Sequence, residues 1–180
     1  MGKITIKDKT FRPYMSGKEI SLIIDEVAEK INADYEGKGE VPVILCVLNG
    51  AMVFTAELLK RLRFDCELAS LKITSYCGAS STGKVQSING VNGDIKGKKV
   101  IICEDIVDTG ISMEFLLNYL PQFGPSDIKV CTFLHKPGAR LRDVRLDYVG
   151  KDIPNDFIVG FGFDYDEIGR NYPDIYVLDE

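Results

Sequence analysis

Two runs of apolar residues constrain the fold of this chain more than any other feature of the sequence. Residues 41–48 read VPVILCVL, and residues 99–103 read KVIIC. A continuous apolar, β-branched run is typical of a strand that is covered on both faces of a parallel sheet. A helical pattern follows each run, AMVFTAELLKRL after the first and SMEFLLNYLPQF after the second. This β-α-β order predicts an α/β fold with a central, mainly parallel sheet flanked by helices.

The remaining elements are predicted from local patterns. Ser16 and Glu19 have the spacing of a capping box, and apolar residues follow at helical intervals, so a helix is expected over residues 16–32. Further strands are expected near residues 67–74, 128–134, 157–163 and 174–178. A chain of 180 residues is within the range of one domain, so residues 1–180 are expected to form a single unit.

Residues 76–98 are rich in Gly, Ser and Asn and show almost no hydrophobic period. Connections of this length without an element of their own are usually functional loops or disordered segments. We therefore expect a mobile loop there, acting as a lid.

Composition narrows the class of partner and the compartment. The formal net charge is -5, which gives no long-range attraction to nucleic acid or to an anionic membrane and favours small-molecule partners. The five cysteines form no CxxC pair, and three of them stand in apolar runs, as expected of buried thiols in a reducing compartment. The sequence has neither a signal-peptide pattern nor an apolar run of membrane-spanning length. A cytoplasmic location is expected.

Two neighbouring acids, Glu104 and Asp105, are expected where the strand over residues 99–103 finishes. Ligands of open α/β sheets bind beyond the carboxyl ends of the strands, so both carboxylates should face a crevice. Two adjacent acids repel each other unless a cation such as Mg²⁺, or the hydroxyls of a ribose, satisfies them. The alternative is a solvated acidic turn.

The next residues, Asp108-Thr109-Gly110-Ile111-Ser112, directly precede a predicted helix. A turn that contains glycine can aim backbone N–H groups at an anion, and two hydroxyls and a helix N-terminus add donors. This is the chemistry that holds a phosphate monoester, whereas a simple helix N-cap would explain only Ser112. The segment lacks both GxxxxGK[ST] and GxGxxG, which excludes a P-loop and a dinucleotide fingerprint.

As a whole, residues 100–113 (VIICEDIVDTGISM) closely resemble the signature of type I phosphoribosyltransferases. Together with three more segments, LNGAMVF and SYCGASSTG before it and FIVGFGFDYDEIGR after it, this signature stands in the order typical of the hypoxanthine (hypoxanthine-guanine) phosphoribosyltransferase branch. The resemblance implies the type I fold, with a small hood and a mobile catalytic loop. It also implies transfer of phosphoribose from phosphoribosyl pyrophosphate to a 6-oxopurine with Mg²⁺, giving IMP or GMP and pyrophosphate, in a homodimer or homotetramer.

The resemblance also assigns roles around the phosphoribosyl donor. Glu104 and Asp105 would hold the ribose hydroxyls, directly or through Mg²⁺, and Asp108 would be the general base. The 5′-phosphate would be wrapped by Asp108, Thr109, Gly110, Ile111 and Ser112.

For the purine, the resemblance implies that Lys136 donates to the exocyclic oxygen, that Phe157 stacks on the ring and that Ile158 offers backbone groups. An ammonium is only a donor, so it selects an oxo over an amino group. Side chains alternate along a strand, so His135 should face away from Lys136. The alternatives are a solvated strand end for Lys136, an ordinary surface or packing role for His135 and a plain core position for Phe157.

For the leaving group and metal, Asp164 would help to place Mg²⁺ beside the purine, and Arg170 would bind pyrophosphate; either could instead be a surface charge. Asn49 and Gly50 match the pyrophosphate loop, with a non-proline cis peptide implied at Leu48-Asn49. Asn49 stands where many relatives carry lysine, so backbone contact is expected rather than a charged side chain. Ser75 and Tyr76, at the start of the catalytic loop, would close over the site.

Two other classes of function remain open at this stage. One is a non-catalytic regulator that keeps this fold to sense nucleotides and bind RNA, although such a protein needs a basic face. The other is a Mg²⁺-dependent signalling domain of flavodoxin-like order that uses Glu104 and Asp105 alone. The second leaves Lys136, Asp164 and the lid without a role.

Overall fold

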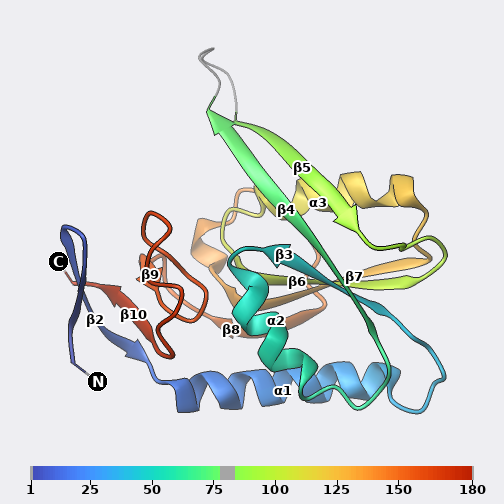
Figure 1. Ribbon diagram of the computed structural model, residues 1–180, viewed down its shortest axis with the longest axis horizontal. Coiled ribbons are helices and arrows are strands. Elements are labelled where there is room, and N and C mark those ends of the chain that lie inside the picture. The colour runs from blue at the N-terminus through green and yellow to red at the C-terminus, as the bar shows by residue number, and fades with distance from the viewer. Residues whose placement is uncertain (1, 78–83, 180) are drawn as a thin grey trace.

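The computed structural model describes residues 2–77 and 84–179, with all their side chains except those of residues 74–77, 84–89 and 92. Two sheets form the scaffold (Figure 1). The larger, six-stranded sheet runs in the order β5 (Lys84–Asn92), β4 (Glu67–Cys77), β3 (Val43–Leu48), β6 (Lys99–Val107), β7 (Asp127–His135) and β8 (Tyr148–Asp152). All neighbours pair in parallel except β4 and β5. The smaller sheet, the hood, runs in the order β1 (Ile4–Ile6), β2 (Lys9–Met15), β10 (Ile175–Leu178) and β9 (Ile158–Val159).

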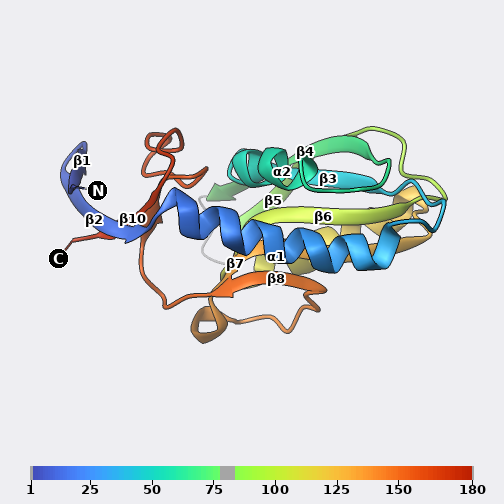
Figure 2. The same cartoon turned by 90° about the horizontal axis from the view of Figure 1, so that it is seen from below.

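Helices cover both faces of the large sheet. The views in Figures 1 and 2 place α1 (Gly17–Tyr35) and α2 (Ala51–Leu59) on one face, where they pack with one core cluster. The other face packs against α3 (Ile111–Tyr119), which a 3₁₀ turn, η1 (Leu120–Phe123), continues. The predicted α/β class with a mainly parallel sheet is confirmed. In the described part of the chain no helix has the length and apolar character needed to cross a membrane.

The first helix begins where its sequence signal predicts. The Ser16 side chain accepts from the Glu19 backbone N–H at 3.3 Å, and the Glu19 carboxylate accepts from the Ser16 N–H at 2.9 Å, which completes the capping box. Its buried side includes Ile20, Ile24 and Val27.

The strand that leads to Glu104 and Asp105, which we call the acid pair, is longer than predicted. Pairing of β6 with β3 stops at Cys103, but pairing with β7 continues to Val107, so β6 includes both acids. The prediction that the strand finishes at Cys103 is therefore wrong. The ladder between β3 and β6 stops at Cys46 and Cys103 while β7 runs on, so Glu104 and Asp105 lie where β6 is paired on one side only.

The prediction of a loop over residues 76–98 is wrong for residues 76–77 and 84–92, which belong to β4 and β5. Strand β5 pairs antiparallel with β4, with Ser75 opposite Gln86 and Tyr76 opposite Val85. A hairpin satisfies its backbone groups through the partner strand, whatever the side chains, so a polar composition does not prevent it. Residues 78–83, and with them the expected mobile tip, lie outside the described residues.

Two more predicted elements are shorter than expected. A strand was expected over residues 157–163, but β9 holds only Ile158–Val159, since Gly160, Phe161 and Gly162 all have positive φ. The third helix stops at Tyr119, because Pro121 lacks an N–H and its ring cannot continue an α-helix. The short β1, β2 and β8 had no clear signal in the sequence.

Candidate active site

The end of β3 meets the acid pair of β6. The chain leaves β3 through a cis peptide between Leu48 and Asn49, as the resemblance implies, and enters α2 at Gly50. A Cβ atom added to Gly50 would lie 1.8 Å from an Oδ atom of Asp105. The backbone of the Asn49-Gly50 turn therefore abuts the Asp105 carboxyl group, and only glycine allows this approach.

Both acids are partly buried. Burial, with the negative charge of Asp105 next to it, raises the pKa of Glu104 well above its usual range. Burial also raises the pKa of Asp105, although a hydrogen bond from the Ile106 N–H and the positive charge of Arg170 oppose the rise. A ligand that brings a cation or hydroxyl donors would relieve this cost, so the pair is suited to binding such a group.

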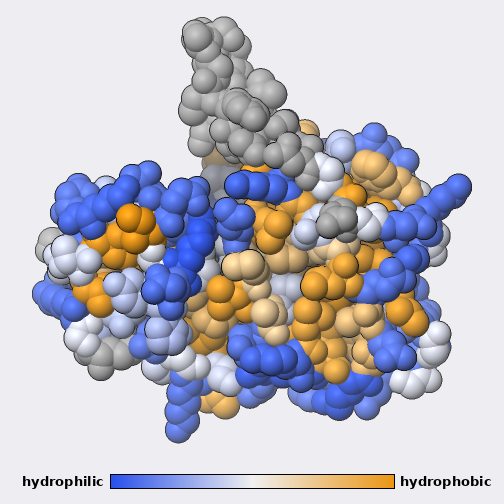
Figure 3. Space-filling view, in the orientation of Figure 1, coloured by the Kyte–Doolittle hydropathy of each residue, from blue (hydrophilic) through white to orange (hydrophobic). Residues whose placement is uncertain are grey.

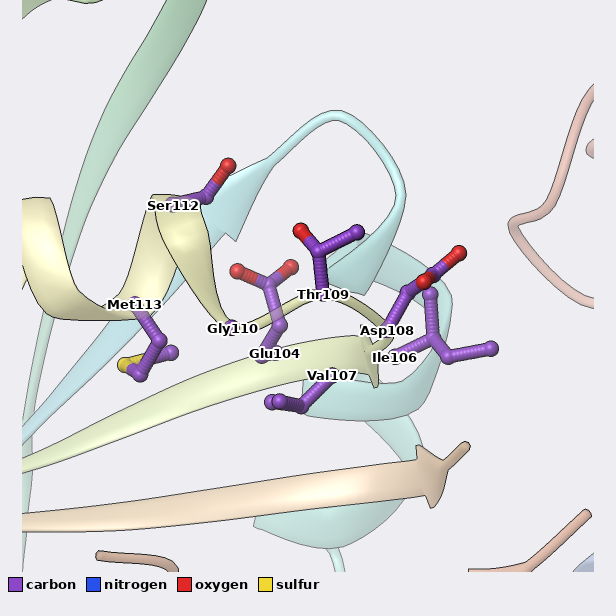
Figure 4. Close-up of a pocket in the computed structure, with 8 residues that line it drawn as sticks. All are labelled: Glu104, Ile106, Val107, Asp108, Thr109, Gly110, Ser112 and Met113. Carbon is purple, nitrogen blue, oxygen red and sulfur yellow. The ribbon is translucent and has the colours of Figure 1, made fainter. Parts of the chain in front are cut away.

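A tight turn joins β6 to α3. Gly110 has φ 79° and is the residue before the helix, so the first N–H groups of α3 face the turn. A small pocket opens there, and Figure 4 shows the Thr109, Ser112 and Glu104 oxygens on one side, with Met113 and Val107 turned to the other. Ser112 is the second helical residue rather than the N-cap, which corrects the simple capping alternative.

Lys136 is brought beside this turn from the next strand along the sheet. Its side chain follows β7, is only 10 % exposed, and its Nζ atom lies 3.8 Å from an Oδ atom of Asp108. The Lys136 N–H also donates to the Val107 carbonyl at 2.9 Å, which keeps the two strand ends together. His135 does not share this place, because its ring bonds to Asp152 at 2.8 Å.

The C-terminal segment over residues 160–170 packs against the Asn49-Gly50 turn, beside the acid pair. A Cβ on Gly162 would lie 2.3 Å from the Gly50 carbonyl oxygen, so the two turns are in direct contact. The Arg170 guanidinium donates to the Gly162 carbonyl at 2.8 Å and pairs with Asp164 at 2.8 Å. Its positive charge also opposes the rise in the pKa of Asp105.

Phe157 lies in a second cluster, on the hood. The residue is 45 % exposed, and its ring packs against Phe11 and Tyr165 at centroid distances of 6.2 and 6.0 Å. Ile158 is buried and belongs to the core cluster that joins the hood to the large sheet. An exposed aromatic side chain beside a buried strand suits stacking on a flat ring. Ser75 and Tyr76 are placed by their backbone in β4, and their side chains lie outside the described residues.

Comparison with known proteins decides the family. The model of the phosphoribosyl transferase domain matches residues 14–166. This chain belongs to the phosphoribosyltransferase family. It is 42% identical to a hypoxanthine-guanine phosphoribosyltransferase of Streptococcus agalactiae over 92% of this chain and 91% of that protein. It is also 38% identical to a hypoxanthine-guanine-xanthine phosphoribosyltransferase of Tritrichomonas foetus, over 100% of this chain and 98% of that protein.

A solved structure with a similar fold is that of a hypoxanthine phosphoribosyltransferase from Staphylococcus aureus. It has a TM-score of 0.86 at 30% identity and covers 93% of this chain and 91% of that chain. The protein is therefore a phosphoribosyltransferase, and the type I fold predicted from the sequence is confirmed.

Two structural contacts of this phosphoribosyltransferase had no sequence signal that singled them out. Gly162 stands in a glycine-rich segment that was interpreted as a strand, and only the tertiary fold shows its contact with Gly50. Arg140 follows Lys136 in an irregular stretch and was assigned no role from the sequence, yet it is partly buried and makes three side-chain hydrogen bonds.

The raised pKa of Glu104 has a consequence for the stability of the ligand-free phosphoribosyltransferase. Because the folded pKa is above the unfolded one, the unfolded chain loses this proton first as the pH rises, and stability falls across that window. We expect Glu104→Gln to raise the urea midpoint at about pH 8 and to leave it almost unchanged near pH 4, where the carboxyl group is mostly protonated in both states. Glu26→Gln, on the exposed side of α1, is the control. An equal shift at both pH values would contradict a charge-based cost.

Proposed function

We propose that this phosphoribosyltransferase acts in purine salvage and transfers the 5-phosphoribosyl group of phosphoribosyl pyrophosphate to N9 of hypoxanthine and guanine. The products are IMP or GMP and pyrophosphate. We call the turn over residues 108–112 the phosphate turn. The observation that carries the proposal is that Lys136 Nζ lies 3.8 Å from an Oδ atom of Asp108, at the rim of this turn. A donor-only group and a carboxylate side by side match the exocyclic oxygen and the imidazole ring of a 6-oxopurine. The names of the relatives agree with this substrate class.

Phosphoribosyl pyrophosphate would lie along the site, from the phosphate turn to the acid pair. The backbone N–H groups at the start of α3 and the hydroxyls of Thr109 and Ser112 would hold the 5′-phosphate, with Asp108, Gly110 and Ile111 shaping the turn. Glu104 and Asp105 would accept hydrogen bonds from the ribose hydroxyls. Half-exposed Asp108 would accept the purine proton as N9 attacks the anomeric carbon from the face opposite the leaving group.

The leaving pyrophosphate would meet the Asn49-Gly50 turn and Arg170. The uncharged Asn49 leaves backbone groups and the Arg170 guanidinium as the partners for its negative charge. Arg170 is held by Asp164 and Glu167 at 2.8 and 3.2 Å, so pyrophosphate would compete with these carboxylates for its N–H groups. Ser75 and Tyr76 would close over the leaving group and exclude water.

The carboxylate oxygens of Glu104, Asp105 and Asp164 suit Mg²⁺ as the cofactor. Mg²⁺ takes oxygen ligands and is commonly held by one or two carboxylates together with substrate phosphates. No group of three ligating side chains that could hold a metal unaided occurs among the described residues, so the substrate would complete the site. Glu104 and Asp105 would hold one ion and Asp164 a second. The bound ion would supply positive charge to the leaving pyrophosphate.

The purine would lie between Lys136 and the hood. The exposed face of Phe157 would stack on the ring, and Ile158 would offer its backbone groups to the ring edge. The hydrogen bond from the Leu178 N–H to the Phe157 carbonyl, at 2.9 Å, fixes this strand to β10 and with it the place of the ring.

The test is pyrophosphate release by the full chain with Mg²⁺ and phosphoribosyl pyrophosphate. Adenine, hypoxanthine, guanine, xanthine and uracil are supplied one at a time, and a reaction without a base measures hydrolysis of the donor. Release is expected with hypoxanthine and guanine and not with adenine or uracil. No release above the base-free reaction with any 6-oxopurine would refute the proposal.

Lys136→Ala is expected to relax the choice of base. Loss of a buried donor to the exocyclic oxygen should raise the KM for hypoxanthine about 10-fold or more, since charged hydrogen bonds contribute about 1.5–3 kcal/mol. The ratio of kcat/KM for hypoxanthine to that for adenine should fall by a similar factor. Lys151→Ala, which removes an exposed lysine of β8, is the control. An unchanged ratio of the two kcat/KM values would mean that Lys136 does not select hypoxanthine over adenine.

We also propose that the protein is a cytoplasmic homodimer or homotetramer. Figure 3 shows apolar surface over α2 and the adjoining part of β4, and Met52 and Leu68 there are 54% and 62% exposed. Apolar patches of this kind usually mark an interface. Light scattering in solution would measure the oligomeric state.

A further inference from the structure

The phosphate turn rests on a segment that has no regular structure of its own. The Thr109 carbonyl accepts from the N–H groups of Leu141 and Arg142, at 2.9 and 3.0 Å. A Cβ added to Gly110 would lie 2.8 Å from the Arg142 carbonyl oxygen. Residues 141–144, which we call the support segment, follow the 3₁₀ turn η2 (Pro137–Ala139) and precede β8, with no helix or strand between. The geometry of the turn therefore depends on what holds the support segment in place.

The Arg140 side chain holds the support segment in place. Its Nε donates to the Arg142 carbonyl at 3.0 Å, one terminal nitrogen donates to the Val144 carbonyl at 2.7 Å, and the other lies 3.0 Å from Nε2 of His135. The guanidinium is 18 % exposed and also lies 3.6 Å from Asp143. A planar fork with fixed donor directions can bind two carbonyls and a ring nitrogen at once, which a lysine cannot do.

His135 ties this arrangement to the large sheet. Because a guanidinium only donates, Nε2 of His135 must be the acceptor, so the ring proton lies on Nδ1 and is donated to Asp152 at 2.8 Å. His135 ends β7 and Asp152 ends β8, and the two residues are partners in the parallel ladder. The support segment is thus connected through Arg140 and His135 to two strand ends.

We propose that Arg140 is a positioning residue for the 5′-phosphate subsite. It binds the support segment to the ends of β7 and β8, and the support segment in turn holds Thr109 and Gly110 in the shape that presents the N–H groups of α3 to phosphate. In the described part of the chain, the hydrogen bonds and the ion pair of the Arg140 side chain involve none of the residues that line the phosphate pocket, so it acts through the support segment rather than on the substrate. This inference rests on the proposed function of the turn as a 5′-phosphate site.

The test compares ligands that carry a 5′-phosphate with ligands that do not. For Arg140→Met we expect the KM for phosphoribosyl pyrophosphate and the Kd of IMP to rise about 10-fold, since each lost hydrogen bond weakens the hold on the turn. The KM for hypoxanthine and the Kd of pyrophosphate should change by less than about twofold. Arg140→Lys, which keeps the charge and loses the fork, should restore only part of the IMP affinity.

The matched control is Arg145→Gln in the same stretch of chain, whose side chain is 83% exposed; it should leave all four constants unchanged. If Arg140→Met does not yield folded protein, as judged by circular dichroism, Arg140→Lys carries the test with the same expected pattern. Equal losses for IMP and pyrophosphate would show a general structural role and overturn the proposal, as would an unchanged affinity for IMP. Failure of the parent protein to bind IMP would refute the proposed function instead.

Discussion

Replacing Asp108 by asparagine is expected to lower the turnover number about 10²–10⁴-fold, the usual contribution of a general base. Asparagine keeps the size and the hydrogen-bonding reach of the side chain but cannot accept the purine proton. The KM for phosphoribosyl pyrophosphate should change by less than about threefold, because the phosphate turn is held mainly by backbone groups and not by this carboxylate. Steady-state kinetics with hypoxanthine, together with the Kd of IMP, measure both effects.

The control for this variant is Asp65→Asn, an exposed acid far along the chain from the turn. It removes the same charge from the protein and should leave turnover unchanged. A turnover number for Asp108→Asn within about threefold of the parent's would remove the general-base role. A loss confined to donor affinity would assign Asp108 to binding of the donor instead.

Gly50→Ala is expected to cause the second large loss. The added methyl group would stand 1.8 Å from an Oδ atom of Asp105, so the Asn49-Gly50 turn or the acid pair must move. A displacement of about 1 Å in a catalytic site can cost about 10²-fold in rate, and overpacking commonly costs about 1–3 kcal/mol of stability. The variant should therefore lose at least about 10²-fold in kcat/KM, measured by pyrophosphate release, and unfold at a lower urea concentration.

The local conformation makes this prediction specific. Gly50 has ordinary helical angles, φ -59° and ψ -47°, at which alanine is favoured over glycine. Any loss must then come from the contact with Asp105 and not from the backbone. Gly138→Ala, where a Cβ would lie 3.4 Å from the flexible Asn155 side chain, is the control and should retain activity. Parental activity in Gly50→Ala would mean that the turn and Asp105 can separate without cost.

Several features of the fold follow from the sequence because their cause is local. The runs that became β3 and residues 100–103 of β6 are apolar on both faces and rich in β-branched residues, as expected of buried strands. The capping box at Ser16 is likewise set by residues within one turn of chain, and the residue types of the Asp-Thr-Gly turn stand side by side in the sequence. The phosphate turn between Asp108 and Ser112 was predictable for this reason.

Other features depend on partners that are distant in the chain. The polar segment of β5 became a strand because β4 supplies its hydrogen bonds, and β6 extends past Cys103 because β7 continues beside it. Sequence patterns describe side-chain burial and do not record which neighbouring strand completes a backbone ladder.

The sequence by itself determined the chemistry of the site: two adjacent acids, an Asp-Thr-Gly turn at a helix start, and a lysine after the next strand. Only the tertiary structure decided how these groups meet: Lys136 beside Asp108, Gly50 against Asp105, and Arg140 behind the phosphate turn. The reason is physical. A turn or a cap is set by the torsion angles of neighbouring residues, whereas each of these contacts is fixed by strand register and by close packing between segments far apart in the chain.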